Sequence, residues 1–148
     1  MILVDANILL YAYDPLSRYH EAARKWLEAT FSEPKPVGLP WASILAFVRI
    51  STNPRLLDCP LSIDEAIKIV SVWLARANVT VLNPGERHWE ILQHLLVEGQ
   101  AAGPLATDAH LAVLAIEHGA ALASADRDFA RFPGLRFFNP LVAGSRSC

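Results

Sequence analysis

The chain has few cysteines and no long hydrophobic run. Its 148 residues include only two cysteines, Cys59 and Cys148, which are too few and too far apart for a disulfide framework or a zinc site. No uninterrupted apolar run reaches the ~18–20 residues of a membrane span. The apolar N-terminus also lacks the basic flank and the small-residue cleavage site of a signal peptide. We therefore expect a reduced, cytoplasmic protein without a membrane segment.

A strong net charge is absent as well. The formal net charge of −2 argues against a protein that coats nucleic acid electrostatically, although an enzyme with a local basic rim stays possible. Most of the 13 cationic residues are arginines, which suit bidentate contacts to phosphate. Arginine-rich usage can equally reflect genome composition.

Apolar residues are abundant. They make up 53% of the chain, and the mean hydropathy is +0.27, which is high for a single domain. The excess predicts a surface covered by a partner protein or by a second copy of the chain. Because no repeat, low-complexity segment or linker interrupts the sequence, we expect one domain over residues 1–148. Residues 144–148 are expected to form a mobile tail.

Short apolar runs alternate with amphipathic segments along the whole chain. Asn7 and Thr107 are predicted helix N-caps, and Ser62 with Glu65 forms a capping box. Strands separated by helices, with no tandem hairpins, indicate an α/β sandwich with a parallel sheet. The expected strands cover residues 2–4, 37–39, 79–82, 120–124 and 135–138.

Aspartates occur at three points of this pattern, two of them directly after strands and one at the start of a helix. Asp5 follows the first apolar strand, Asp108 lies in the first turn of a helix, and Asp126 and Asp128 follow a later strand. Each has a simple structural explanation when taken alone. Asp5 can cap the next helix, Asp108 can offset the helix dipole by about 0.3–1 kcal/mol, and the last two can be polar loop residues.

Taken together, the three positions indicate a metal site. In a parallel sheet with right-handed crossovers they lie on the same edge. Like charges gathered there repel one another unless a cation neutralises them. Oxygen ligands without cysteine or a histidine pair favour Mg²⁺, with Mn²⁺ as a substitute. A common use of such a site is in-line attack on a phosphodiester.

Three segments carry a resemblance to a known family. VDANILLYAY at the N-terminus, TDAHLA at a helix start and SADRDF after a late strand resemble the PIN-domain ribonucleases, and in particular the VapC toxins of type II toxin–antitoxin systems. FVRISTNPR, over residues 47–55, also resembles a stretch of one VapC subgroup. The resemblance covers residues 1–140.

The resemblance implies a PIN-like α/β/α sandwich with a central, mainly parallel sheet of about four or five strands. It also implies Mg²⁺-dependent cleavage of a structured RNA such as tRNA or rRNA, a homodimer, and neutralisation by a cognate VapB-type antitoxin. DNA would be contacted only through that antitoxin.

The family's site residues can be carried over by position. Asp5, Asp108 and Asp126 match the metal-binding catalytic acids. Asn7 and Ser124 match polar positions that orient the carboxylates or metal-bound waters, and Asp128 would be an auxiliary carboxylate.

One family feature is missing. Many members have a glutamate on the helix after the second strand, which here spans residues 41–52, but no carboxylate lies between Glu33 and Asp58. The matching position is Ala46, with Ser43 one turn earlier as a candidate auxiliary group. We therefore hypothesise a one-metal or weak two-metal site, and a catalytically inactive relative stays possible. Arg49 and Arg127 are candidate RNA contacts, or else solvated or salt-bridged arginines.

Two other functions remain open. Asp5 could be the nucleophile of an aspartyl-phosphate phosphatase, although such enzymes usually have a second aspartate where this chain has Asn7. The chain could also be an interaction module whose acidic patch is a vestige. The five histidines form no ligand spacing with one another, so packing is the expected role of His110.

Overall fold

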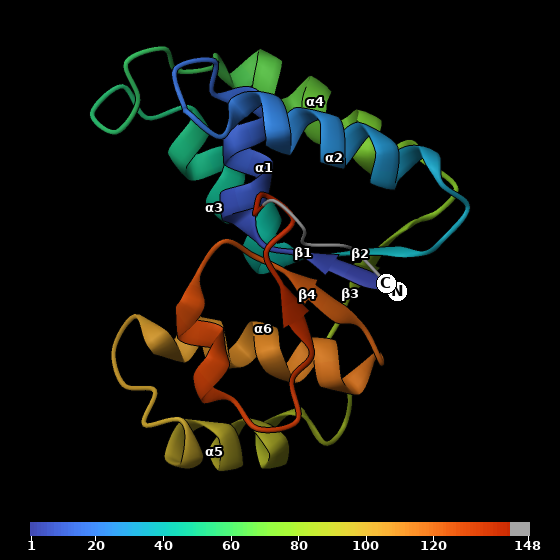
Figure 1. Ribbon diagram of the computed structural model, residues 1–148, viewed down its shortest axis with the longest axis vertical. Coiled ribbons are helices and arrows are strands. Elements are labelled where there is room, and N and C mark those ends of the chain that lie inside the picture. Colours follow the sequence, from blue (N-terminus) through green and yellow to red (C-terminus); the bar gives the residue numbers. More distant parts are fainter. Residues whose placement is uncertain (143–148) are drawn as a thin grey trace.

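The computed structural model describes residues 1–142, and the tail expected at residues 144–148 lies outside this described part. Five parallel strands form one sheet in the order β3-β2-β1-β4-β5. Helices cover both faces, α1 to α4 on one side and α5 with α6 on the other (Figure 1). The predicted α/β/α sandwich is confirmed, and its sheet is parallel throughout.

Two α-helices separate each of the first four strands from the next, and one 3-10 helix separates the last two strands. The elements are β1 (Ile2–Val4), α1 (Ala6–Tyr13), α2 (His20–Ser32), β2 (Val37–Pro40), α3 (Trp41–Ser51), α4 (Ile63–Ala75), β3 (Val79–Leu82), α5 (His88–Glu98), α6 (Leu105–Glu117), β4 (Ala121–Ala123), the 3-10 helix η1 (Arg127–Arg131) and β5 (Phe137–Phe138).

The sheet separates two hydrophobic cores because successive side chains of a strand point to opposite faces. In β1, Leu3 packs into the core formed with α5, α6 and η1, whereas Val4 packs into the core formed with α1, α2 and α3. Both side chains are fully buried. The apolar run at the N-terminus is therefore the central strand between two helical layers.

Two predicted helix caps are wrong. Asp5, and not Asn7, caps α1, because its Oδ1 accepts a hydrogen bond from the Ala6 amide at 2.7 Å. Helix α6 begins at Leu105, before Thr107, and has no side-chain cap. The capping box of Ser62 and Glu65 at the start of α4 is confirmed.

Strand register sets the position of the acidic residues. Val4 of β1 pairs with Ala123 of β4, so the next residues, Asp5 and Ser124, emerge side by side at the carboxyl edge of the sheet. The amide of Asp5 donates to the Ala123 carbonyl at 3.0 Å. No helix within residues 1–142 is both long and apolar enough to cross a membrane.

Candidate active site

A hydrogen-bond network around Ser124 joins the ends of β1 and β4. The buried Ser124 hydroxyl donates to Asp5 Oδ2 at 2.7 Å. It accepts from the Asn7 side-chain amide at 3.2 Å and from the Asp126 backbone amide at 3.0 Å. Asn7 Oδ1 in turn accepts from the Ala125 amide at 3.4 Å. One hydroxyl thus links Asp5 and Asn7, near the N-terminus, to the segment that carries Asp126.

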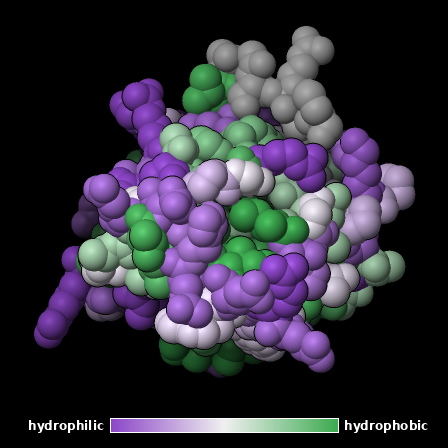
Figure 2. Space-filling model, turned by 90° about the horizontal axis from the view of Figure 1, so that it is seen from below, coloured by the Kyte–Doolittle hydropathy of each residue, from purple (hydrophilic) through white to green (hydrophobic). Residues whose placement is uncertain are grey.

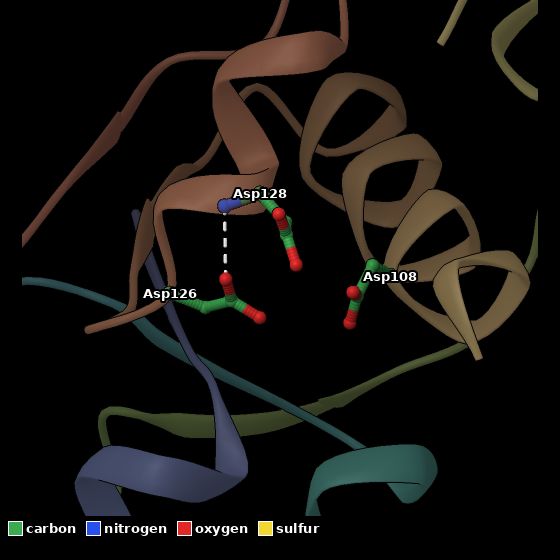
Figure 3. A group of neighbouring side chains, drawn as sticks. All are labelled: Asp108, Asp126 and Asp128. Carbon is green, nitrogen blue, oxygen red and sulfur yellow. Dashed lines mark hydrogen bonds between the residues drawn. The ribbon is translucent and has the colours of Figure 1, made fainter. Parts of the chain in front are cut away.

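A second group of carboxylates lies beside this network. One oxygen from each of Asp108, Asp126 and Asp128 lies within 4.8 Å of the other two. Asp108 comes from α6, and the other two come from the start of η1, with their side chains directed toward a common space (Figure 3). The Asp128 amide donates to Asp126 Oδ1 at 2.8 Å, which fixes the orientation of that carboxylate.

Both Asp5 and Asp108 are held in surroundings that disfavour their charge. Burial raises the pKa of Asp5, opposed by its hydrogen bonds from Ser124 and Ala6, and the nearby Asp126 raises it further. Burial also raises the pKa of Asp108, to about 6, with further contributions from the charges of Asp126, Asp5 and Asp128. Asp5, Asp108 and Asp126 therefore share one negatively charged region, as expected.

The donor set of this region fits a hard divalent cation. It offers carboxylate oxygens only, which suit Mg²⁺ or Mn²⁺ better than zinc. One oxygen of each carboxylate lies within 4.8 Å of the other two, so the three side chains converge on a common space. Asp108, Asp126 and Asp128 could hold such an ion, with Asp5 next to it.

Three other predicted site residues do not belong to the Ser124 network or to the carboxylate group. Ser43 is buried in α3, and its hydroxyl has no hydrogen-bond partner within residues 1–142, so the structure does not bring it into the Ser124 network. Arg49, in the last turn of α3, and Arg127, at the start of η1, are both exposed.

A polar chain that the sequence did not indicate connects α5 with α6. His88 Nδ1 lies 2.5 Å from Glu117 Oε1, and His88 Nε2 lies 2.8 Å from His110 Nδ1. Glu117 Oε2 also accepts from the Gly85 amide at 2.8 Å. His110 therefore packs between the helices as expected, but its ring contacts another histidine through a hydrogen bond. The seven-residue spacing of His110 and Glu117 on one helix face was the only available signal.

A separate groove of about 610 Å³ lies between α1, α2 and α4. Its lining includes Leu27, Phe31 and Trp73 but none of the aspartates of the acidic region. The acidic region thus occupies the carboxyl edge of the sheet, where open α/β proteins bind ligands, and the groove lies among the helices.

A parallel α/β fold with clustered carboxylates at the carboxyl edge of its sheet is typical of enzymes that act on phosphate esters, and phosphodiester hydrolases are one class of these. The model of the PIN domain family matches residues 2–135 of this chain. The chain therefore belongs to the PIN domain family and, within it, to the VapC ribonucleases.

Relatives of known name support this placement. Ribonuclease VapC37 of Mycobacterium tuberculosis is 42% identical over 140 residues, which cover 95% of this chain and 97% of that protein. Ribonuclease VapC43 of the same species is 40% identical over 141 residues, covering 95% of this chain and 96% of that protein.

Solved structures show the same fold at low sequence identity. VapBC2 from Rickettsia felis, bound to a DNA fragment from its promoter, matches with a TM-score of 0.68 at 17% identity, over 94% of this chain and 98% of that one. The sarcin-ricin loop cleaving toxin VapC20 of Mycobacterium tuberculosis matches with a TM-score of 0.66 at 16% identity, over 92% and 99%.

Proposed function

We propose that this protein is a Mg²⁺-dependent endoribonuclease toxin that cleaves a structured RNA such as tRNA or rRNA. The observation that carries the proposal is the convergence of Asp108, Asp126 and Asp128 beside Asp5, in a chain that belongs to the VapC ribonucleases. A divalent ion bound there would supply an activated water nucleophile and stabilise charge on the phosphate. Mn²⁺ is expected to substitute for Mg²⁺.

We assign the other roles in the reaction to individual residues of the site. Asp108 and Asp126 would hold the ion, with Asp5 as a third carboxylate of the same region. Ser124 and Asn7 orient Asp5 and Asp126 through the hydrogen bonds described above. Arg49 and Arg127 would contact RNA phosphates, to which the guanidinium group can donate two hydrogen bonds.

The partner of such a toxin would be a VapB-type antitoxin, with DNA contacted only through that antitoxin. Support comes from related folds that were solved as VapBC complexes, two of them on DNA. An RNA substrate implies a cytoplasmic site of action.

We also propose a homodimer. Trp41 and Leu45, one turn apart on α3, are 50% and 63% exposed. Viewed from the end of the molecule at which α5 lies, the surface shows hydrophobic patches between hydrophilic side chains (Figure 2). Sedimentation of the full chain at several concentrations would detect the dimer.

Chelation tests the enzymatic proposal. Purified protein without antitoxin should cut total tRNA or rRNA at defined positions, lose this activity in EDTA, and regain it when Mg²⁺ or Mn²⁺ is added. Sequencing of the new RNA ends identifies the substrate. If the folded protein binds no Mn²⁺ in a calorimetric titration, the acidic patch is a vestige and the interaction-module alternative holds.

A further inference from the structure

The first turn of α3 lies beside the acidic region. The parallel register of β1 with β2 brings Pro40 to the level of Asp5 at the carboxyl edge of the sheet, where neighbouring strands are roughly 4.8 Å apart. Trp41 follows Pro40 and begins α3, and Ala42 packs against the core that contains α6. In Figure 3 the start of α3, in teal, lies on the side of the carboxylates where Asp108 extends from α6. Trp41 is therefore close to the place where a phosphate would be cleaved.

The ring of Trp41 is available for contact with a ligand. Half of this residue is exposed to solvent. Within residues 1–142 its ring stacks on no other aromatic side chain, whereas Trp26 meets Phe138 and Trp73 meets Phe47 in edge-on contacts. An exposed indole ring next to a site for phosphate chemistry is suited to stacking on a nucleobase, because every base has an open π-face when it is unpaired.

A stripe of exposed side chains leads from Trp41 along α3. Leu45 and Arg49 follow at intervals of four residues, so the three side chains lie along one face of the helix. Eight residues of helix place Arg49 about 12 Å from Trp41 along the axis. Arg49 forms no ion pair with any carboxylate in the described part of the chain. The stripe thus combines an aromatic ring with a cation, as sites for single-stranded RNA do.

We infer that Trp41 stacks on an unpaired RNA base next to the phosphate that is cleaved, and that Arg49 binds a phosphate further along the same strand. A base inside a double helix cannot take this place, because its neighbours cover both of its faces. The inference therefore restricts the substrate to nucleotides in loops, bulges or single strands. It rests on the proposed function, because it assumes that the acidic region acts on RNA.

Fluorescence anisotropy with a labelled single-stranded oligoadenylate tests the stacking contact. The full, antitoxin-free chain is titrated in EDTA, and again in Mg²⁺, at one fixed salt concentration. Trp41→Leu keeps an apolar side chain but removes the aromatic face, so RNA binding should weaken about tenfold, whereas Trp41→Phe should keep most of the affinity. If Trp41→Leu binds as tightly as the wild type, the inference is wrong and the proposed function stands. If the wild type neither binds nor cleaves RNA in either condition, the proposed function fails first.

Trp89 provides a matched control on another helix. It is 64% exposed in the first turn of α5. Its neighbour His88 contacts Glu117, which ends α6, so Trp89 lies toward the end of α6 opposite to Asp108. Trp89→Leu should therefore bind the oligoadenylate as the wild type does. An equal loss in both leucine variants would show a general effect of surface tryptophans and would overturn the inference.

An abasic strand tests stacking without any change to the protein. The wild type should bind oligoadenylate about tenfold more tightly than an abasic strand of the same length, and Trp41→Leu should lose most of this preference. Equal binding of the two strands by the wild type would refute the stacking contact. Arg49→Gln should lower the slope of log K against log salt concentration by about 0.7, and Trp41→Leu should leave it unchanged. An unchanged slope in Arg49→Gln would refute its phosphate contact.

Sedimentation of the same variants separates RNA stacking from contact between two copies of the chain. Trp41 also supports the dimer proposed above, but Trp41→Leu keeps an apolar side chain, so the dimer should persist while RNA binding weakens. Loss of the dimer with unchanged RNA affinity would place Trp41 in the interface and overturn the inference. Since Trp41 belongs to neither hydrophobic core of residues 1–142, its variants should keep the wild-type circular dichroism spectrum and melting temperature.

Discussion

Asp108→Asn should reduce RNA cleavage about a thousandfold and, in the metal-free protein, make the fold more stable. The lost activity corresponds to roughly 4 kcal/mol of transition-state stabilisation, since an amide is a poor ligand for a hard cation. Single-turnover cleavage of the identified RNA, with enzyme in excess and saturating Mg²⁺, measures this effect. Cleavage by Asp108→Asn at the wild-type rate would contradict the proposed site.

The gain in stability follows from the raised pKa of Asp108. This pKa is about 6 in the folded protein against an ordinary value of 3.8, so the folded state binds more protons than the unfolded state between these pH values. The contribution of Asp108 to stability is complete below about pH 4 and is lost as the pH rises through 6. The asparagine variant lacks this loss, because its side chain is never charged.

Urea unfolding in EDTA measures the difference at two pH values. At about pH 7 the Asp108→Asn variant should exceed the wild type by about 1 kcal/mol, since solvent screens a group that is only partly buried. At about pH 4 or below the difference should shrink to near zero. Asp58→Asn is the matched control, and its free energy of unfolding should follow that of the wild type at both pH values.

Ser124→Ala should cost the fold about 2 kcal/mol and also weaken metal binding. The alanine leaves Asp5 Oδ2, the Asn7 amide group and the Asp126 amide without their common partner in a buried setting, and an unsatisfied buried group costs about 1–3 kcal/mol. Asp5 and Asp126 would also lose their fixed separation. Urea unfolding and Mn²⁺ titration on the same preparations measure the two effects.

Ser43→Ala is an unusually close control for this substitution. Ser43 and Ser124 are both 1% exposed, but the Ser43 hydroxyl has no hydrogen-bond partner within residues 1–142. Its removal should therefore leave stability unchanged or slightly improved, with Mn²⁺ affinity intact. Equal losses in both variants would show that deletion of any buried hydroxyl, and not the Ser124 network, is responsible.

The sequence was sufficient for the architecture because the strands are short and mostly apolar. Runs such as Ile2–Val4 can only be buried on both faces, and the helices between them require parallel strands. The same argument correctly predicted that Asp5, Asp108 and Asp126 share one region. That prediction depended on the positions at which strands end, and local residue patterns are enough to locate those positions.

Finer features depended on side-chain geometry that no pattern encodes. Asp5 was predicted to be either a helix cap or a site residue, and the structure shows that it caps α1 while lying in the acidic region. The start of helix α6 was predicted too late, because the small-residue segment before it carries no strong helix-start signal. Arg131 donates to the backbone carbonyls of Gly99 and Gln100, and a histidine chain joins α5 with α6. Neither feature can be predicted without the packed tertiary structure.

The carboxylates that converge on the sheet edge belong to segments that meet only after the chain has folded. A cation held there would bind the native state and not the unfolded chain, so its concentration would govern conformational equilibrium as well as chemistry. At a hundred times its dissociation constant, such a cation would favour the native state by about 2.7 kcal/mol. The supply of divalent ions in a cell would then help to determine how long a released toxin withstands proteases.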